Sequence, residues 1–298
     1  MGRIVKDYRL AKNDRNSVLE YWSDYGEFAY ETGLNGGDSE HHAGTPFSLQ
    51  VSLKPGTGLM VLEKDEHAVE QLSRCMAQAI KGYGLESVLH NAEADIEPFM
   101  RHLRKHEIKK LPFRDSMVEC YNFGNHYRQG LKPLSYRLLG RRRQSWEEVV
   151  GGASKEALKS WLYEAWKFTE ENWRQEIPQI SAKTGKPIKP LLVKSDAEGE
   201  LKHVLRYVSD SVTYQPWEKM QEFGWFGSDW FQVIQDVVGP VPMKGIGNCD
   251  LQSAMEYGCA DADDALCLAL RFEQMRQEYA ANWGVEQEDW DVRQQERT

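Results

Sequence analysis

The sequence predicts an α/β fold with a mixed sheet, flanking helices and a large, mostly helical insertion. Three observations lead to this prediction. In the first half of the chain, short apolar segments alternate with segments of helical periodicity. A helix is indicated near the C-terminus, and a stretch rich in helix formers and aromatic residues precedes it. The chain has 298 residues, 41% of them hydrophobic, so it can bury a full core.

The predicted sheet begins with three strands. Residues 25–30 are expected to form the first strand. Residues 47–53 and 58–62 alternate apolar and polar side chains and are separated by a Lys-Pro-Gly-Thr turn at 54–57. This pattern predicts a hairpin that follows the first strand.

Helices and a further strand follow the hairpin. Residues 67–79 have helical periodicity, 87–90 read as a short buried strand, and 96–106 as a second helix. The order β-β-β-α-β-α is typical of an α/β domain with a mixed sheet.

The last third of the chain contains the insertion and the final helix. Residues 154–247 are predicted to be a helical, aromatic-rich insertion into a domain formed by 1–153 and 248–298. The insertion holds a basic loop at 183–190 and two tryptophans next to glycines, Trp225 and Trp230. Its aromatic rings either fill a core between the inserted helices or stack on the bases of a single strand.

Charge and cysteine content restrict the class of protein. The net charge of −9 argues against a broad basic face for nonspecific duplex binding. Five scattered cysteines with no CxxC pair indicate reduced thiols. Residues 1–16 lack an apolar signal region, and no apolar run is long enough to cross a bilayer. We therefore expect a cytoplasmic protein that does not bind membranes.

Residues able to do chemistry are concentrated in three segments. Tyr257 and Asp261 are four residues apart in a run with helical spacing, 254–275, so the phenol and the carboxylate share one helix face. The two upstream segments are Ala29-Tyr30-Glu31-Thr32-Gly33-Leu34 and His90-Asn91-Ala92-Glu93-Ala94-Asp95. Carboxylates from several segments are the ligands that hard ions such as Mg²⁺ and Mn²⁺ prefer.

Together these segments resemble the three exonuclease motifs of the DEDD superfamily in its tyrosine-bearing form (DEDDy). The closest resemblance is to the proofreading 3′–5′ exonuclease domain of family A DNA polymerases. Residues 113–121, 130–140 and 146–151 resemble further stretches of that domain in the same order. The resemblance implies a ribonuclease-H-like fold and hydrolysis of single-stranded DNA ends by two-metal-ion catalysis.

The resemblance also implies a role for each motif residue. Glu31, Asp95 and Asp261 would ligate two Mg²⁺ or Mn²⁺ ions, and Ala29 stands where the family has the first Asp of an Asp-x-Glu motif. Tyr257 would orient the attacking water. Four further residues are implied to contact the substrate: Thr32, Leu34, His90 and Asn91.

Ala29 departs from the family pattern, because alanine cannot ligate a metal. The chain is therefore expected to be an inactive exonuclease, through an engineered Asp-to-Ala change or a natural loss of activity. Two other classes stay open, a non-catalytic nucleic-acid-binding or polymerase-accessory subunit and an RNA-directed exonuclease. The expected partners are a single-stranded DNA 3′ end and a DNA polymerase or replication protein, in replication or repair in a bacterial or phage-infected cell.

Other polar residues are expected to have ordinary roles. Asp263 and Asp264 should lie on a solvated helix face. His102 and His106 share a helix face, but no third zinc ligand is visible and the neighbouring Arg and Lys residues disfavour a cation. The basic segment 141–143 is either a solvated turn or a phosphate contact.

Overall fold

The computed structural model describes residues 6–42, 44–123, 129–172 and 235–283. The chain divides into two compact units, one formed by 1–145 with 250–298 and the other by 146–249. The helices and strands of the first unit are β1 (Asp7–Leu10), α1 (Asn16–Thr32), β2 (Leu34–His42), β3 (Thr45–Ser52), β4 (Thr57–Leu62), α2 (Glu66–Tyr83), β5 (Glu86–Leu89), α3 (Ile96–Leu103), the 3₁₀ turn η1 (Arg104–His106), β6 (Phe113–Asp115), α4 (Ser116–Asn122), α5 (Leu131–Leu134), the π-helical turn η2 (Ser135–Leu139) and α10 (Leu251–Trp283).

The first unit is built on a mixed six-stranded sheet in the order β1-β4-β3-β2-β5-β6. The strands β2, β3 and β4 form an antiparallel meander, with Asp38 opposite Gln50 and Gln50 opposite Met60. Strand β5 pairs in parallel with β2, and β6 pairs in parallel with β5. The predicted α/β class with a mixed sheet is confirmed, as is the hairpin at 47–62.

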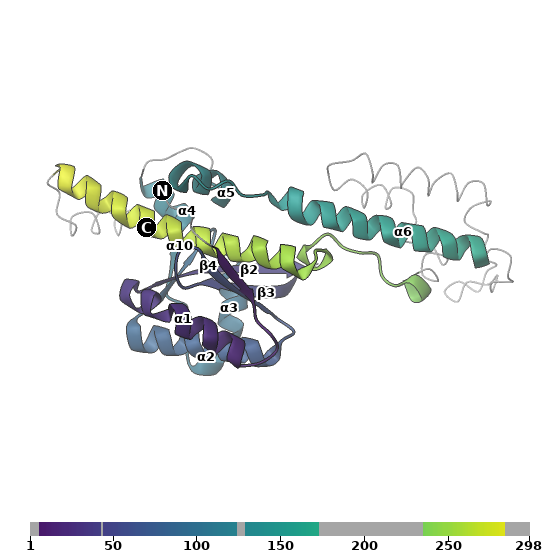
Figure 1. Ribbon diagram of the computed structural model, residues 1–298, viewed down its shortest axis with the longest axis horizontal. Coiled ribbons are helices and arrows are strands. Elements are labelled where there is room, and N and C mark those ends of the chain that lie inside the picture. The colour runs from purple at the N-terminus through teal and green to yellow at the C-terminus, as the bar shows by residue number, and fades with distance from the viewer. Residues whose placement is uncertain (1–5, 43, 124–128, 173–234, 284–298) are drawn as a thin grey trace. The chain divides into compact units, whose positions relative to one another are not determined.

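Helices cover both faces of this sheet, and Figure 1 shows α10 across one face and α1 and α2 on the other. The face toward α1 and α2 carries an apolar core, to which the alternate β3 residues Leu49 and Val51 contribute, together with Leu53 just after the strand. The face toward α10 is apolar beside Leu34 but polar at its centre. Three fully buried polar side chains of β3 lie on that face: Ser48, Gln50 and Ser52.

The predicted strand at 25–30 is wrong, because these residues form the C-terminal half of helix α1. The buried positions of α1 recur every three or four residues, at Val18, Tyr21, Trp22, Gly26 and Ala29, which is the spacing of one helix face. The first strand of the meander is instead β2, immediately downstream. Ala29, Glu31 and Thr32 of the first motif therefore lie on a helix, whereas Leu34 begins β2.

The second unit, 146–249, contains the π-helical turn η3 (Glu147–Gly151), helix α6 (Gly152–Asn172) and the 3₁₀ turn η5 (Ile246–Asn248). The indole Nε1 of Trp161 donates to the carbonyl oxygen of Gly239 at 2.8 Å. Most of the predicted insertion, including the basic loop 183–190 and both Trp225 and Trp230, lies outside the described residues. The prediction of a helical insertion at 154–247 therefore stays a prediction.

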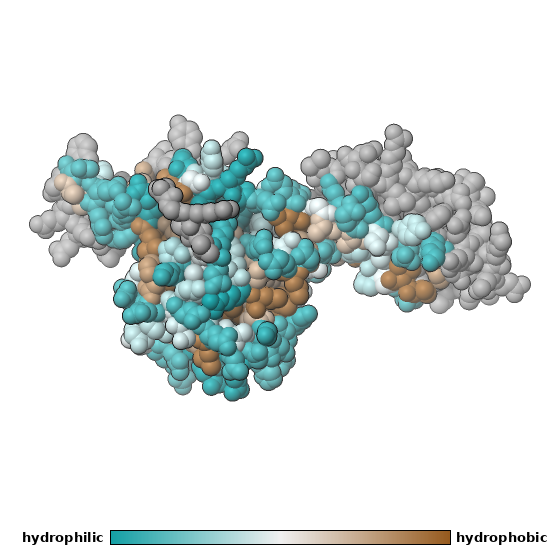
Figure 2. All heavy atoms as spheres, viewed as in Figure 1, coloured by the Kyte–Doolittle hydropathy of each residue, from teal (hydrophilic) through white to brown (hydrophobic). Residues whose placement is uncertain are grey.

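The visible surface of the first unit is mainly hydrophilic, with scattered apolar patches (Figure 2). Within the described ranges, no helix combines the length and apolar character needed to cross a membrane.

Candidate functional site

Three carboxylates converge where α10 crosses β2. Asp38 and Glu40 are two residues apart on β2, so both side chains point to the α10 face. Asp261 approaches them from α10, and one oxygen from each of the three carboxylates lies within 4.8 Å of the others. In the described part of the chain, this is the one group of three or more His, Cys, Asp or Glu side chains that could hold a metal ion.

Close packing of α10 on β2 sets this geometry. A side chain on Gly36 would place its Cβ 1.9 Å from the carbonyl oxygen of Ala262, the residue after Asp261. A glycine at this position of β2 lets the helix backbone rest directly on the strand. Gly36 therefore brings Asp261 within reach of Asp38, which lies two residues after Gly36 on the same face of β2.

Asp95 lies beside this group, at the end of the parallel pair β2 and β5. It is the N-cap residue of α3, but its side chain makes no cap hydrogen bond. Its Oδ1 instead accepts from the backbone N–H of Ser39 at 2.9 Å and from the Ser39 hydroxyl at 2.7 Å. Ser39 separates Asp38 from Glu40, so Asp95 is tied to the strand segment that carries two of the three converging carboxylates.

Crowding and burial raise the pKa of these carboxyl groups. Burial, with the charges of Asp95 and Glu40, raises the pKa of Asp38 well above its usual range. Burial raises the pKa of Glu40 to about 8, where Lys132 opposes the rise and Asp95 adds to it. Burial also raises the pKa of Asp95 to about 6, against the hydrogen bonds from Ser39. A positive charge placed among these carboxyl groups would favour their ionised form and lower their pKa values.

The counter-ion in the described structure is Lys132 of α5. Its ammonium is ion-paired with Asp261 and lies 4.3 Å from the centre of the Tyr257 ring. Burial lowers the pKa of Lys132 to about 8, while Asp38, Asp264 and Glu40 hold it up. This lysine could not be recognised from the sequence, because the packing of α5 on α10 brings it to the carboxylates.

Tyr257 shares its helix face with Asp261, as the sequence predicts. Its side chain is half-buried, and burial together with Glu40 and Asp38 raises the pKa of the phenol. The hydroxyl therefore keeps its proton at neutral pH.

The loop from β5 to α3 carries two of the residues implied to contact substrate. His90 is half-buried, and its Nδ1 lies 2.8 Å from the Ser116 hydroxyl. Asn91 is exposed and has a left-handed backbone, with φ of 62°. The Asp115 carboxylate accepts from the backbone N–H groups of Asn91 at 3.2 Å and Ala92 at 3.0 Å, which fixes the loop. The substrate roles of His90 and Asn91 stay predictions.

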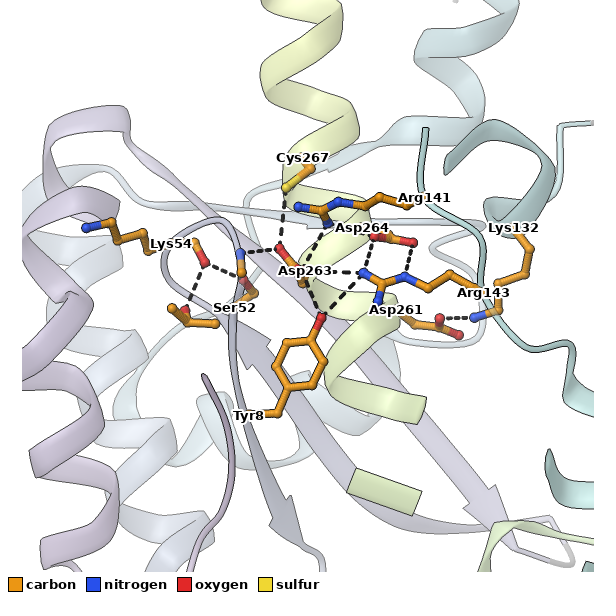
Figure 3. A network of polar contacts seen from close by, with 12 residues as sticks. Tyr8, Ser52, Lys54, Lys132, Arg141, Arg143, Asp261, Asp263, Asp264 and Cys267 are labelled. Carbon is orange, nitrogen blue, oxygen red and sulfur yellow. Dashed lines mark hydrogen bonds and ion pairs between the residues drawn. The ribbon is translucent and has the colours of Figure 1, made fainter. Parts of the chain in front are cut away.

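The expected solvated position of Asp263 and Asp264 is wrong, because both are buried in an ion-pair network (Figure 3). Arg141 and Arg143 pair with both aspartates, and Arg143 lies 2.6 Å from Asp264. Asp263 also accepts from the Tyr8 hydroxyl at 2.9 Å. Side chains on the face of α10 that packs on the sheet are buried, and here two acidic side chains are buried together with their arginine partners.

The remaining four motif residues lie away from the carboxylate group. Ala29 is fully buried in the core on the α1 face, and Glu31 is exposed in the last turn of α1. The Thr32 hydroxyl donates to the Phe28 carbonyl at 2.9 Å at the end of the same helix. Leu34 packs against α10 in an apolar cluster. Ala29 is therefore not at the converging carboxylates, and the expected loss of activity through Ala29 loses its structural basis.

The residues that sequence reasoning missed are Asp38 and Glu40. The segment Asp38-Ser39-Glu40 has the Asp-x-Glu spacing of the resembled family. The same spacing also occurs at 95–97 and 196–198, so spacing alone does not select it. The position of this segment directly before the predicted hairpin could have selected it, because the first strand of a meander directly precedes the hairpin in the chain.

A hard divalent cation fits these residues. The Oδ2 atom of Asp38 is buried and has no hydrogen-bond partner among the described residues, and the Lys132 ammonium already stands in for a cation at Asp261. Carboxylate oxygens suit Mg²⁺ and Mn²⁺. The two histidines considered for zinc are occupied elsewhere, since His102 contacts Glu63 at 3.0 Å and His106 contacts Ser73 at 3.0 Å.

No protein-family model matches this chain, and a search of curated proteins finds no significant match.

Proposed function

We propose that the chain is a DEDDy-type 3′–5′ exonuclease that hydrolyses single-stranded DNA ends with two Mg²⁺ or Mn²⁺ ions. The observation that carries the proposal is the convergence of Asp38, Glu40 and Asp261 within 4.8 Å, with Tyr257 one helical turn before Asp261. With Asp95 beside them, these residues supply the complete Asp-x-Glu, Asp and Tyr-x-x-x-Asp set of the resembled family. The chain as written is expected to be active.

The topology supports a ribonuclease-H-like fold. Strands β2, β3 and β4, then α2, β5 and α3, follow the order β-β-β-α-β-α of such folds. The candidate ligands lie on central strand β2 and at the carboxyl end of its parallel neighbour β5. In α/β sheets, ligands bind beyond the carboxyl ends of strands, where the strand order changes direction.

Each residue has a task that its surroundings support. Asp38, Glu40 and Asp261 would hold two cations, with Asp95 as a further acidic group tied to Ser39. When bound, such ions activate the attacking water and stabilise the leaving oxygen. Tyr257 would orient that water through its protonated hydroxyl. The loop of His90 and Asn91 would receive the terminal nucleotide, and aromatic rings of the segment 154–247 would stack on the bases of the single strand.

Nucleotide release from end-labelled oligonucleotides tests the proposal. Purified protein is incubated with 5′-labelled single-stranded DNA or RNA, in Mg²⁺, in Mn²⁺ and in EDTA. We expect stepwise shortening of DNA that requires a metal, and a fall of at least roughly a hundredfold for Asp38→Asn, since even changes outside the ligand set cost 10- to 100-fold.

Glu31→Gln is the matched control for this experiment. Glu31 is an exposed carboxylate on α1, so its neutralisation should leave the rate unchanged. Shortening of RNA alone would assign the chain to the RNA-directed class. An unaltered protein that binds single strands but releases nothing from either substrate would support a non-catalytic subunit.

A further inference from the structure

Gln50 lies at the carboxylate site but has no role in the function proposed above. It is the β3 residue directly opposite Asp38 in the antiparallel pair with β2, so both side chains share the face toward α10. Its side chain is fully buried. A long polar side chain in this position must satisfy its amide inside the protein.

Only one half of the Gln50 amide is satisfied in the described structure. Its Nε2 donates to the Ser48 hydroxyl at 2.7 Å, while its Oε1 is buried and has no hydrogen-bond partner among the described residues. The same is true of Oδ2 of Asp38, directly across the strand pair. A buried acceptor without a donor is destabilising, because it has given up its hydrogen bonds to water without replacement. Two such acceptors on one cross-strand pair indicate a ligand that supplies donors or positive charge.

Helix α10 holds the Gln50 amide in place. A side chain on Gly258 would put its Cβ 2.8 Å from both Cδ and Nε2 of Gln50, so the amide lies directly against the helix backbone. Gly258 is the residue after Tyr257. The amide is therefore packed between Ser48 and the turn of α10 that carries Tyr257.

We propose that Gln50 is a positioning residue of the carboxylate site, whose Oε1 accepts a hydrogen bond from the hydration shell of a divalent cation held at Asp38. The inference rests on the proposed function, because it requires cations at Asp38, Glu40 and Asp261. It adds a neutral amide to the acidic group and explains why both acceptors of the cross-strand pair lack a hydrogen-bond partner among the described residues. Groups of this kind fix the water and the carboxylate around an ion, and their removal weakens metal binding.

Gln50→Leu tests this role, with Gln71→Leu as the matched control. Gln71 is also a buried glutamine, but it belongs to α2 on the opposite side of the sheet, where its Nε2 donates to the Cys75 sulfur at 3.3 Å. Mn²⁺ affinity is measured by electron paramagnetic resonance, and thermal stability is measured in EDTA. We expect Gln50→Leu to weaken Mn²⁺ binding roughly 10- to 100-fold without lowering the metal-free Tm, and Gln71→Leu to leave Mn²⁺ binding unchanged.

Gln50→Glu provides a second, independent test. Glutamate keeps an acceptor oxygen and adds negative charge, so at pH 8 this variant should bind Mn²⁺ at least as tightly as the unaltered protein. If Gln50→Leu binds Mn²⁺ within about twofold of the unaltered protein, or if Gln50→Glu weakens binding, Gln50 has only a structural role. An unaltered protein that neither binds Mn²⁺ nor releases nucleotides would instead refute the proposed function.

Discussion

Breaking the ion pair between Lys132 and Asp261 should lower the stability of the metal-free protein and raise its affinity for a divalent cation. Lys132→Met removes the ammonium and keeps a long apolar stem beside Tyr257. The two side chains are 21% and 10% exposed, so the pair is largely withdrawn from water. Removing one partner of a buried pair costs about 3–5 kcal/mol, because the other charge stays buried and unpaired. In a domain of this size that lowers the Tm by roughly 6–20 °C, at about 2–4 °C per kcal/mol.

The same change should tighten metal binding. Two unit charges 4 Å apart interact by about 4 kcal/mol at an effective dielectric constant of 20, and a divalent cation doubles the interaction. Lys132 relieves part of this repulsion by moving away, so we expect Mn²⁺ to bind at least about tenfold more tightly to Lys132→Met, which corresponds to about 1.4 kcal/mol.

The assay combines thermal melting in EDTA with Mn²⁺ titration by electron paramagnetic resonance at pH 7. Lys81→Met is the matched control, because Lys81 pairs with Glu107 at an exposed position of α2, where the lysine side chain is 51% exposed. This control should change neither the Tm nor the Mn²⁺ affinity appreciably. Unchanged or weaker Mn²⁺ binding by Lys132→Met would refute the view that the lysine occupies a cation position.

Three further outcomes follow from the same structure. Ala29→Asp should not create activity but should unfold or strongly destabilise the protein, by several kcal/mol in a urea titration, because it buries a carboxylate in an apolar core; a stable, more active variant would contradict this. Tyr257→Phe should lower kcat more than about tenfold while KM for DNA and Mn²⁺ affinity stay nearly constant, since the hydroxyl acts on the attacking water; a parallel loss of affinity would indicate a structural tyrosine. The metal-free protein should lose stability as pH rises from about 5 to 8. The pKa of about 8 for Glu40 and about 6 for Asp95 mean that the folded state binds protons that the unfolded state has released. Glu40→Gln should flatten the fall in Tm between pH 6 and 8, and a Tm that rises over that range by the same amount in both proteins would contradict the burial of these acids.

Local sequence patterns predict those parts of the fold in which the periodicity of the side chains matches the observed secondary structure. The hairpin at 47–62 was predictable because its strands alternate and its turn carries Pro55 and Gly56. Helix α2 and the shared face of Tyr257 and Asp261 follow from helical periodicity alone. These features need no information about distant residues.

Two physical reasons explain why the sequence favours a strand at 25–30 over the strand β2 that carries Asp38 and Glu40. The C-terminal half of α1 is rich in aromatic residues and contains Gly26, a composition that also suits a strand, and only the burial spacing of the whole segment identifies a helix. Strand β2 carries Gly36, Gly37 and Asp38, residue types that are depleted in strands. Here the strand conformation is imposed by pairing with β3 and β5. Gly36 serves the close approach of α10, while a side chain on Gly37 would meet Leu89 and Phe99 on the opposite face.

The roles of Lys132 and Gln50 could not be predicted from the sequence. Each depends on a contact with α10, more than a hundred residues away along the chain, and neither belongs to a short motif. For Arg141 and Arg143 the sequence allows either a solvated turn or a phosphate contact. Their pairing with Asp263 and Asp264 likewise depends on the tertiary fold.

Anomalous diffraction from crystals of the unaltered protein grown with Mn²⁺ would locate the bound ions. We expect two Mn²⁺ peaks roughly 3.5–4 Å apart, ligated by the carboxylates of Asp38, Glu40 and Asp261, with Lys132 displaced from Asp261. No anomalous peak at these carboxylates at saturating Mn²⁺, with the ion pair between Lys132 and Asp261 intact, would contradict this expectation.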